Sequence, residues 1–238
     1  MKFISLASSS TGNAYLLRAE GASPLLLEAG LPINQLRDKL RENGASLSDL
    51  AGCLVSHEHG DHSKSVIALL RAGVDCYMSH GTGRSLAITE HHRSHTLYEG
   101  VTMEITPSNW RILPFALEHD AAEPLGFFIG HGDERLLFVA DTGYVKERFS
   151  GITMAAIECN FQAEILSNNI LSGALPSVIG RRVRRSHFSL ENVVSMLKEN
   201  DLSRCREIWL LHLSNGNSDE AAMRSEIQKL TGIPTHIA

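Results

Sequence analysis

The sequence predicts an α/β fold in which two mixed β-sheets stack and helices cover their outer faces, an αββα four-layer sandwich. The chain has 238 residues, of which 43% are hydrophobic and 21% charged, so it supports a sizeable buried core. Strand-like runs come first, and a strand–helix alternation follows twice. The many adjacent strands imply antiparallel pairing, which disfavours one doubly wound sheet. We expect a single domain spanning residues 1–238.

In the first part of the chain, short apolar runs bounded by turn residues predict strands, and periodic apolar positions predict helices. A turn rich in Ser, Gly and Asn at residues 8–13 separates the first two strands. The first helix begins near Pro32 and stops at Asn43-Gly44. We expect strands at 3–7, 14–18, 24–28, 53–56 and 75–78, and helices at 31–43, 63–71 and 82–88.

The middle of the chain is β-rich, and the last third returns to alternating strands and helices. The tip His131-Gly132-Asp133 indicates a hairpin. Residues 173–185 contain Gly, Pro and several Arg, which indicates a connection or insertion. We expect strands at 102–106, 111–117, 126–130, 135–140, 154–158, 207–211 and 234–237, and helices at 161–171, 190–200 and 219–230.

The most informative segment reads His57-Glu58-His59-Gly60-Asp61-His62 and directly follows an apolar run. Alternation in an extended chain puts His57 and His59 on one side, and the turn into the next helix lets Asp61 and His62 face a second ion. Imidazole suits zinc, and carboxylate suits harder ions such as manganese. We expect two divalent ions, with zinc ahead of manganese, and hydrolytic chemistry; the alternative is a polar surface loop.

Three further candidate ligands each follow a predicted strand: His119, Asp141 and His212. A lone His after a strand is usually a surface residue, and a lone Asp is usually a turn former or helix cap. Their succession after the His57–His62 cluster favours a shared metal site.

This order of residues resembles the metallo-β-lactamase superfamily over essentially the whole chain. The resemblance implies a two-metal site along one edge of the sheets. It implies that one ion is held by His57, His59 and His119, that the other is held by Asp61, His62 and His212, and that Asp141 bridges them.

Two positions refine this resemblance. Glu28 stands where the superfamily usually has Asp, a residue that supports the metal loop. His59 stands where di-iron flavoprotein relatives have a carboxylate, so that branch is disfavoured. The N-terminal residues show no signal peptide of the kind exported β-lactamases carry, and we expect a cytoplasmic protein, in the host cytoplasm if a phage encodes it.

A closer resemblance is to phosphodiesterases: the YycJ/WalJ-type exonucleases and, more closely, the phage anti-Pycsar enzymes. The exonuclease resemblance is carried by segments 5–13, 119–124, 141–144 and 212–214, and the closer one by segments 158–160, 186–193 and 211–220. The anti-Pycsar resemblance implies cyclic nucleotide hydrolysis and a homodimer. In ribonuclease Z, a His in a setting like that of His187 serves proton transfer, and Glu158 is expected to orient either His187 or a metal-bound group. Alternatively, His187 belongs to the cap region of the helix that Ser189 starts.

Charge and cysteine content limit the partners. The net charge of −5 argues against coating a long nucleic acid, although the basic run Arg181-Arg182-Val183-Arg184-Arg185 is a local exception. That run is a solvated face, a phosphate contact or a dimer contact. Four scattered Cys indicate reduced thiols, and no apolar run is long enough for a membrane span.

We therefore hypothesise a dinuclear-metal phosphodiesterase that hydrolyses a 3′,5′-cyclic nucleotide. Catalysis is assigned to Asp61, His187 and Glu158, and substrate contacts to Ser9, Asn13, Arg184 and Arg185. The alternatives are a 5′ exonuclease acting on DNA or RNA, a thioester or lactone hydrolase, and a scaffold without activity.

Overall fold

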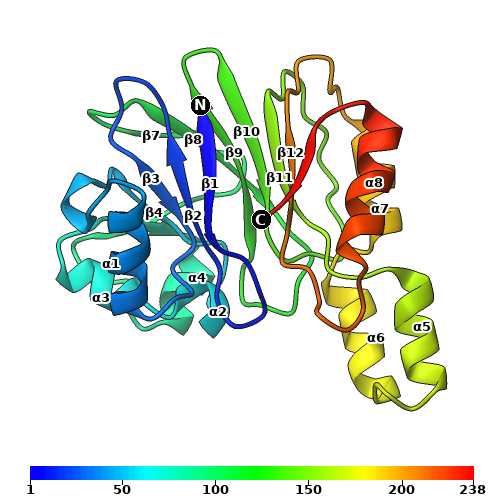
Figure 1. Ribbon diagram of the computed structural model, residues 1–238. Helices are drawn as coiled ribbons and strands as arrows, with labels where there is room; N and C mark the ends of the chain where they lie inside the picture. Colours follow the sequence, from blue (N-terminus) through cyan, green and yellow to red (C-terminus); the bar gives the residue numbers. More distant parts are fainter. The chain divides into compact units, whose positions relative to one another are not determined.

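Thirteen strands form two mixed β-sheets, of six and seven strands, in the computed structural model, which describes residues 1–238. Helices flank both sheets (Figure 1), and this confirms the predicted fold class. Contacts between residues divide the chain into two compact units. The first consists of residues 1–116 and 121–133, and the second of residues 117–120 and 134–238. One domain over residues 1–238 stays a prediction.

The six-stranded sheet lies within the first unit, and its strands are ordered as in the chain. Its strands are β1 (Lys2–Ala7), β2 (Ala14–Arg18), β3 (Leu25–Leu27), β4 (Gly52–Leu54), β5 (Cys76–Met78) and β6 (Ser94–Thr96). The first three pair antiparallel, and β3 to β6 pair parallel. The sequence correctly predicted all of these strands except β6.

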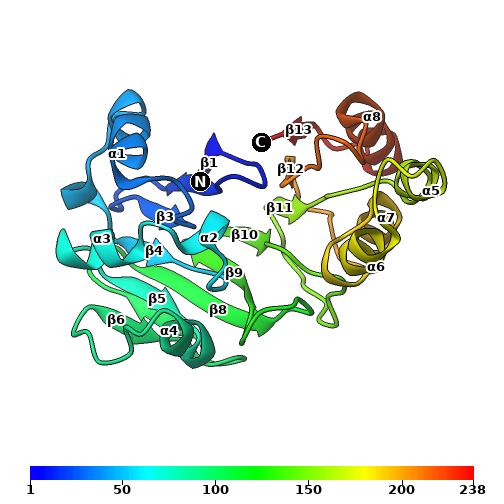
Figure 2. The same ribbon diagram turned by 90° about the horizontal axis from the view of Figure 1, so that it is seen from below.

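Helices connect the parallel strands of this sheet. They are α1 (Ile33–Glu42), the short 3-10 helix η1 (Leu47–Asp49), α2 (Gly60–Ser63), α3 (Val66–Arg71) and α4 (His80–Ser85). Helices α1 and α3 lie on the same face of the sheet (Figures 1 and 2), where Leu36 and Leu69 pack into a core with Leu26 and Val55. The predicted helix at 63–71 is divided, because the Ser65 amide and hydroxyl bond to the segment that follows β3 instead of continuing α2.

Three strands of the seven-stranded sheet also belong to the first unit. They are β7 (Met103–Ile105), β8 (Trp110–Ala116) and β9 (Leu125–His131), which pair antiparallel. The Trp110 indole Nε1 donates to the Ser23 carbonyl at 2.8 Å, and the Leu125 amide donates to the Ser56 carbonyl at 3.0 Å. These bonds fasten β8 and β9 to the segments that border β3 and β4.

The other four strands lie in the second unit. They are β10 (Glu134–Val139), β11 (Met154–Glu158), β12 (Ile208–Leu211) and β13 (Thr235–Ile237), which run parallel. The helices of this unit are α5 (Ala163–Leu171), α6 (Ser177–Ser186), α7 (Leu190–Glu199) and α8 (Glu220–Thr231). Helices α5 and α6 form a pair beyond the ends of α7 and α8 (Figures 1 and 2).

Helix α6 (Ser177–Ser186) occupies most of residues 173–185, which the sequence indicated as a connection or insertion without predicting a helix there. Pro176 precedes the first turn of α6 as its N-cap. The helix is amphipathic, with apolar side chains on one face and basic side chains on another. A Cβ at Gly180 would lie 2.3 Å from Ile170 Cδ1, so this glycine lets α6 approach α5 closely. None of the helices is both long enough and apolar enough to span a membrane.

Candidate metal centre

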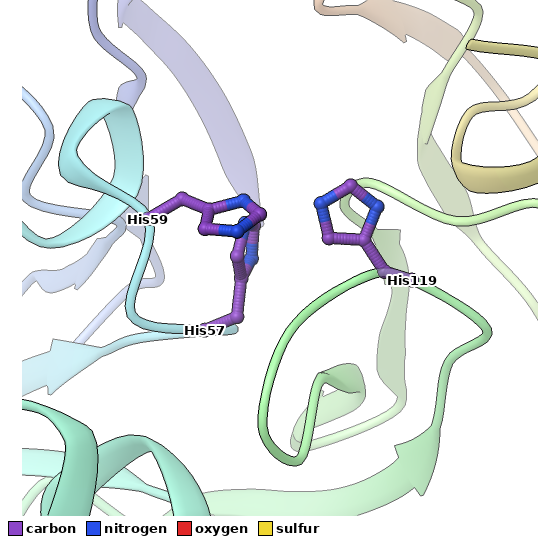
Figure 3. Close-up of side chains that lie close together, drawn as sticks. All are labelled: His57, His59 and His119. Atoms are coloured by element: carbon purple, nitrogen blue, oxygen red, sulfur yellow. The ribbon is translucent and has the colours of Figure 1, made fainter. Parts of the chain in front are cut away.

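In the first unit, the histidines of the His57–His62 segment gather between β4 and α2. The ring of His57 lies 4.6 Å from that of His59 and 4.2 Å from that of His62. His57 and His62 are buried, and His59 is partly exposed. Figure 3 shows His57 and His59 with their rings close together. One short segment therefore concentrates three imidazoles and the carboxylate of Asp61, a donor set that suits zinc and similar divalent ions.

Glu28 contacts this segment, as the resemblance to the superfamily leads us to expect. Its carboxylate is fully buried, accepts the Ser56 amide at 3.2 Å and lies 3.4 Å from His62 Nδ1. The backbone of Glu28 has a φ of 65°, a conformation that non-glycine residues adopt mainly at constrained sites. The Glu28 side chain thus contacts the His57–His62 segment and the residue before it.

Asn13, an expected substrate contact, is fully buried against the same segment. Its Nδ2 donates to the Asp61 carbonyl at 3.3 Å and lies 3.2 Å from His62 Nε2, and its Oδ1 accepts the Ser9 amide at 3.1 Å. Ser9 is partly exposed, and its hydroxyl contacts that of Thr11 at 2.8 Å. Asn13 therefore positions the Asp61 carbonyl and the His62 ring. Substrate contact by Asn13 or Ser9 stays a prediction.

In the second unit, candidate residues collect where parallel strands end. Asp141 follows β10, Glu158 ends β11 and His212 follows β12, so all three reach the carboxyl edge of the parallel strands. His187 follows α6. One potential ligand atom from each of these four residues lies within 4.8 Å of the others. The structure thus brings the expected ligands Asp141 and His212 together with the expected catalytic residues Glu158 and His187.

Hydrogen bonds fix this group of four tightly. His212 Nδ1 donates to Asp141 Oδ1 at 2.7 Å, and His187 Nδ1 donates to Glu158 Oε1 at 2.5 Å. The other Glu158 oxygen accepts the amides of Thr142 at 2.9 Å and Phe188 at 3.0 Å. Glu158 is fully buried and joins the turns that carry Asp141 and His187.

The electrostatics of this group favour cations. Burial by itself would lower the pKa of His212, but the carboxylates of Asp141 and Glu158 outweigh it and raise that pKa to about 10. The pKa of His187 is raised in the same way, mainly by Glu158 acting against burial. Because the carboxylates attract positive charge, a divalent ion bound here would displace the proton only from a histidine that coordinates it.

His119 belongs to the second unit and is oriented by α6. It lies on the loop that follows β8 (Figure 3), and its Nδ1 donates to the Ser186 carbonyl at 2.6 Å. His119 Nε2 lies 3.8 Å from Asp141 Oδ2. Burial lowers the pKa of His119, which favours the neutral form that binds metals. A backbone carbonyl on the second nitrogen is the usual way that a metal-binding imidazole is held.

The remaining expected substrate contacts lie on α6. Arg184 Nη2 donates to the Ser167 hydroxyl of α5 at 2.7 Å, and Arg185 is exposed. The sequence-based reading missed Ser56 and Ser186, which hold His57 and His119. The Ser56 hydroxyl lies 2.8 Å from His57 Nδ1. In the sequence, only the position of Ser56 next to His57 could have indicated this contact. Ser186 acts through its carbonyl, which leaves no signal in the side chain.

Comparison with known proteins identifies the class. Residues 25–212 match the family model of the beta-lactamase superfamily domain, so the chain belongs to the metallo-β-lactamase superfamily. It is a metal-dependent hydrolase with side-chain groups suited to a metal ion.

The chain is also similar to particular proteins of this superfamily. The chain is 30% identical over 230 residues to the exodeoxyribonuclease WalJ of Streptococcus pneumoniae serotype 2, covering 91% of this chain and 83% of that protein. It is 26% identical over 235 residues to the exodeoxyribonuclease YycJ of Bacillus anthracis, covering 97% and 89%. The metallo-β-lactamase fold protein YhfI of Bacillus subtilis superposes with a TM-score of 0.74 at 16% identity, covering 99% and 95%.

Gly30 allows a first test of the His57–His62 segment as a metal site, because a Cβ at Gly30 would lie 1.7 Å from the Asp61 carbonyl oxygen. Gly30→Ala must push the His57–His62 segment away and should reduce both bound metal and stability, the latter by roughly 1–3 kcal/mol. The matched control is Gly60→Ala in the same segment, where a Cβ would meet nothing within 4 Å. Metal analysis and urea unfolding measure both; equal behaviour of the two variants would contradict the role of Gly30.

Glu158→Gln tests the buried carboxylate. An amide cannot accept all the hydrogen bonds that Glu158 accepts from His187, Thr142 and Phe188, so the free energy of unfolding should fall by about 1–3 kcal/mol. Glu226→Gln, an exposed change on α8, is the control. Urea denaturation of the metal-free proteins measures the effect, and wild-type stability of Glu158→Gln would show that the carboxylate is dispensable for this part of the fold.

Proposed function

We propose that the chain is a dinuclear-metal phosphodiesterase that acts as an exonuclease on DNA. The observation that carries phosphodiester chemistry is the His187–Glu158 pair beside the expected ligands Asp141 and His212. The similarity to two exodeoxyribonucleases over nine-tenths of the chain supports DNA as the substrate. The DNA alternative therefore moves ahead of the cyclic nucleotide that the sequence ranked first.

The metal ligands in this proposal are those that the resemblance to the superfamily implies. His57, His59 and His119 would hold one ion, Asp61, His62 and His212 the other, and Asp141 both. Family membership and the imidazole–carboxylate chemistry of each group support this set. Two divalent ions supply charge neutralisation for the phosphate and an acidified attacking water. Zinc and manganese both suit these donors.

His187 supplies the proton in this proposal. Glu158 holds its Nδ1, and against the opposing effect of burial this carboxylate raises the pKa of the ring, which favours the protonated form that can donate. The other nitrogen, Nε2, would donate to the leaving ribose oxygen as the P–O bond breaks. Glu158 is a positioning residue, because it acts through His187 and makes no direct contact with substrate.

Activity on a substrate panel tests the proposal. Protein loaded with zinc or manganese is incubated with end-labelled single-stranded and duplex DNA, RNA, four 3′,5′-cyclic nucleotides, a thioester and a lactone. We expect stepwise release of nucleotides from DNA and its loss in chelator. Turnover of cyclic nucleotides without DNA cleavage would contradict the DNA assignment, and turnover of the thioester or lactone alone would contradict a phosphodiesterase.

Asp141→Ala tests the metal site on the same substrates. It removes the carboxylate shared by both proposed ligand sets, so DNA cleavage should fall at least about 100-fold and bound metal should drop. Asp38→Ala, an exposed change on α1, is the control. Near-wild-type cleavage by Asp141→Ala, with its metal content measured, would remove Asp141 from the site. A homodimer and a cytoplasmic location stay predictions.

A further inference from the structure

A groove of about 780 Å³ lies in the second unit between α6 and the turn Glu118–Asp120. We call it the α6 groove. Four arginines of α6 and two carboxylates of the turn line it, so its walls carry a net positive charge although the chain is acidic. Such a local excess of arginine favours an anionic ligand, because guanidinium binds phosphate oxygens in pairs.

Two of the four arginines already have partners within the protein. Arg182 Nε donates to Asp120 Oδ2 at 2.6 Å, and Arg184 donates to the Ser167 hydroxyl. Arg181 and Arg185 are exposed and make no side-chain hydrogen bond or ion pair. They are four residues apart in one helix, so they share a face with about 5–6 Å between their Cβ atoms. The α6 groove therefore offers two cations side by side.

The α6 groove is continuous with a candidate metal ligand. His119 lines it, and the Ser186 carbonyl at the end of α6 holds His119 Nδ1. A ligand that fills the groove would thus extend from His119 past Arg185 to Arg181. A cyclic mononucleotide has one phosphate and cannot occupy the reacting position and both arginines together. A ligand with successive phosphates can.

We infer that the α6 groove binds the backbone of a single DNA strand beyond the phosphate that is cleaved, with Arg181 and Arg185 each contacting one phosphate. This inference rests on the proposed exonuclease function and names how that site holds its polymer. It makes strand length a determinant of affinity, since only a strand of several nucleotides reaches both arginines.

Binding measurements on the full-length, metal-loaded protein test this inference. The probes are fluorescently labelled single strands of 2, 4, 8 and 12 nucleotides with hydrolysis-resistant phosphorothioate linkages. Their binding to the protein is measured by fluorescence anisotropy at several salt concentrations. A nucleoside triphosphate is the competitor that represents a small polyphosphate. The variants are Arg181→Gln/Arg185→Gln and the charge-retaining Arg181→Lys/Arg185→Lys. The matched control is Arg224→Gln/Lys229→Gln, which removes two exposed cations from α8.

The wild type should bind longer strands more tightly, up to a plateau. The glutamine pair should bind the 12-nucleotide strand about tenfold more weakly, and its salt dependence should decrease by about 1.4 in slope for two lost phosphate contacts. The lysine pair should retain most of the slope, and the α8 control should match the wild type. Unchanged affinity and slope in the glutamine pair would overturn the inference, as would a nucleoside triphosphate that binds as tightly as the 12-nucleotide strand.

These outcomes separate the inference from the proposed function. DNA cleavage together with arginine-independent strand binding would leave the exonuclease standing and remove the α6 groove from it. Arginine-dependent strand binding without DNA cleavage would support the α6 groove and contradict the exonuclease.

Discussion

Two fully buried glutamates, one in each unit, constrain the candidate ligands. A buried carboxylate is tolerable only when donors surround it, so each glutamate organises the backbone around itself. Glu28 accepts the Ser56 amide and lies beside His62, and Glu158 accepts two backbone amides and His187. The turns that carry the histidines are therefore held by charge as well as by the strands they follow.

Direct contacts also orient individual histidines. The Ser56 hydroxyl lies beside His57, the Ser186 carbonyl accepts from His119, and Asp141 accepts from His212. Such contacts choose the tautomer and aim the ring. The same negative charge that raises the pKa of His212 would attract a divalent cation. Family membership thus identifies the hydrolytic chemistry. These contacts show how this chain orients the imidazole rings that are candidate metal ligands.

The sequence predicted the regular elements well where local pattern decides them. The strands at 14–18 and 154–158 have the predicted bounds, because an uninterrupted apolar run defines where each strand begins and ends. Helix α6 was missed because glycine and proline suggested a loop, whereas Gly180 serves close packing against α5. The bond from Asn13 to the Asp61 carbonyl could not be predicted, because in one sequence a buried amide that braces a distant segment looks the same as a substrate contact. Three-dimensional neighbours, such as Ser186 for His119, are likewise invisible to local pattern.

Anomalous X-ray diffraction from crystals of the protein grown with zinc would locate any bound ions. We expect two anomalous peaks per chain at zinc–nitrogen distances of about 2.0–2.1 Å, one beside His57, His59 and His119 and the other beside His62 and His212. A single peak, or peaks away from these histidines, would contradict a dinuclear centre built from them.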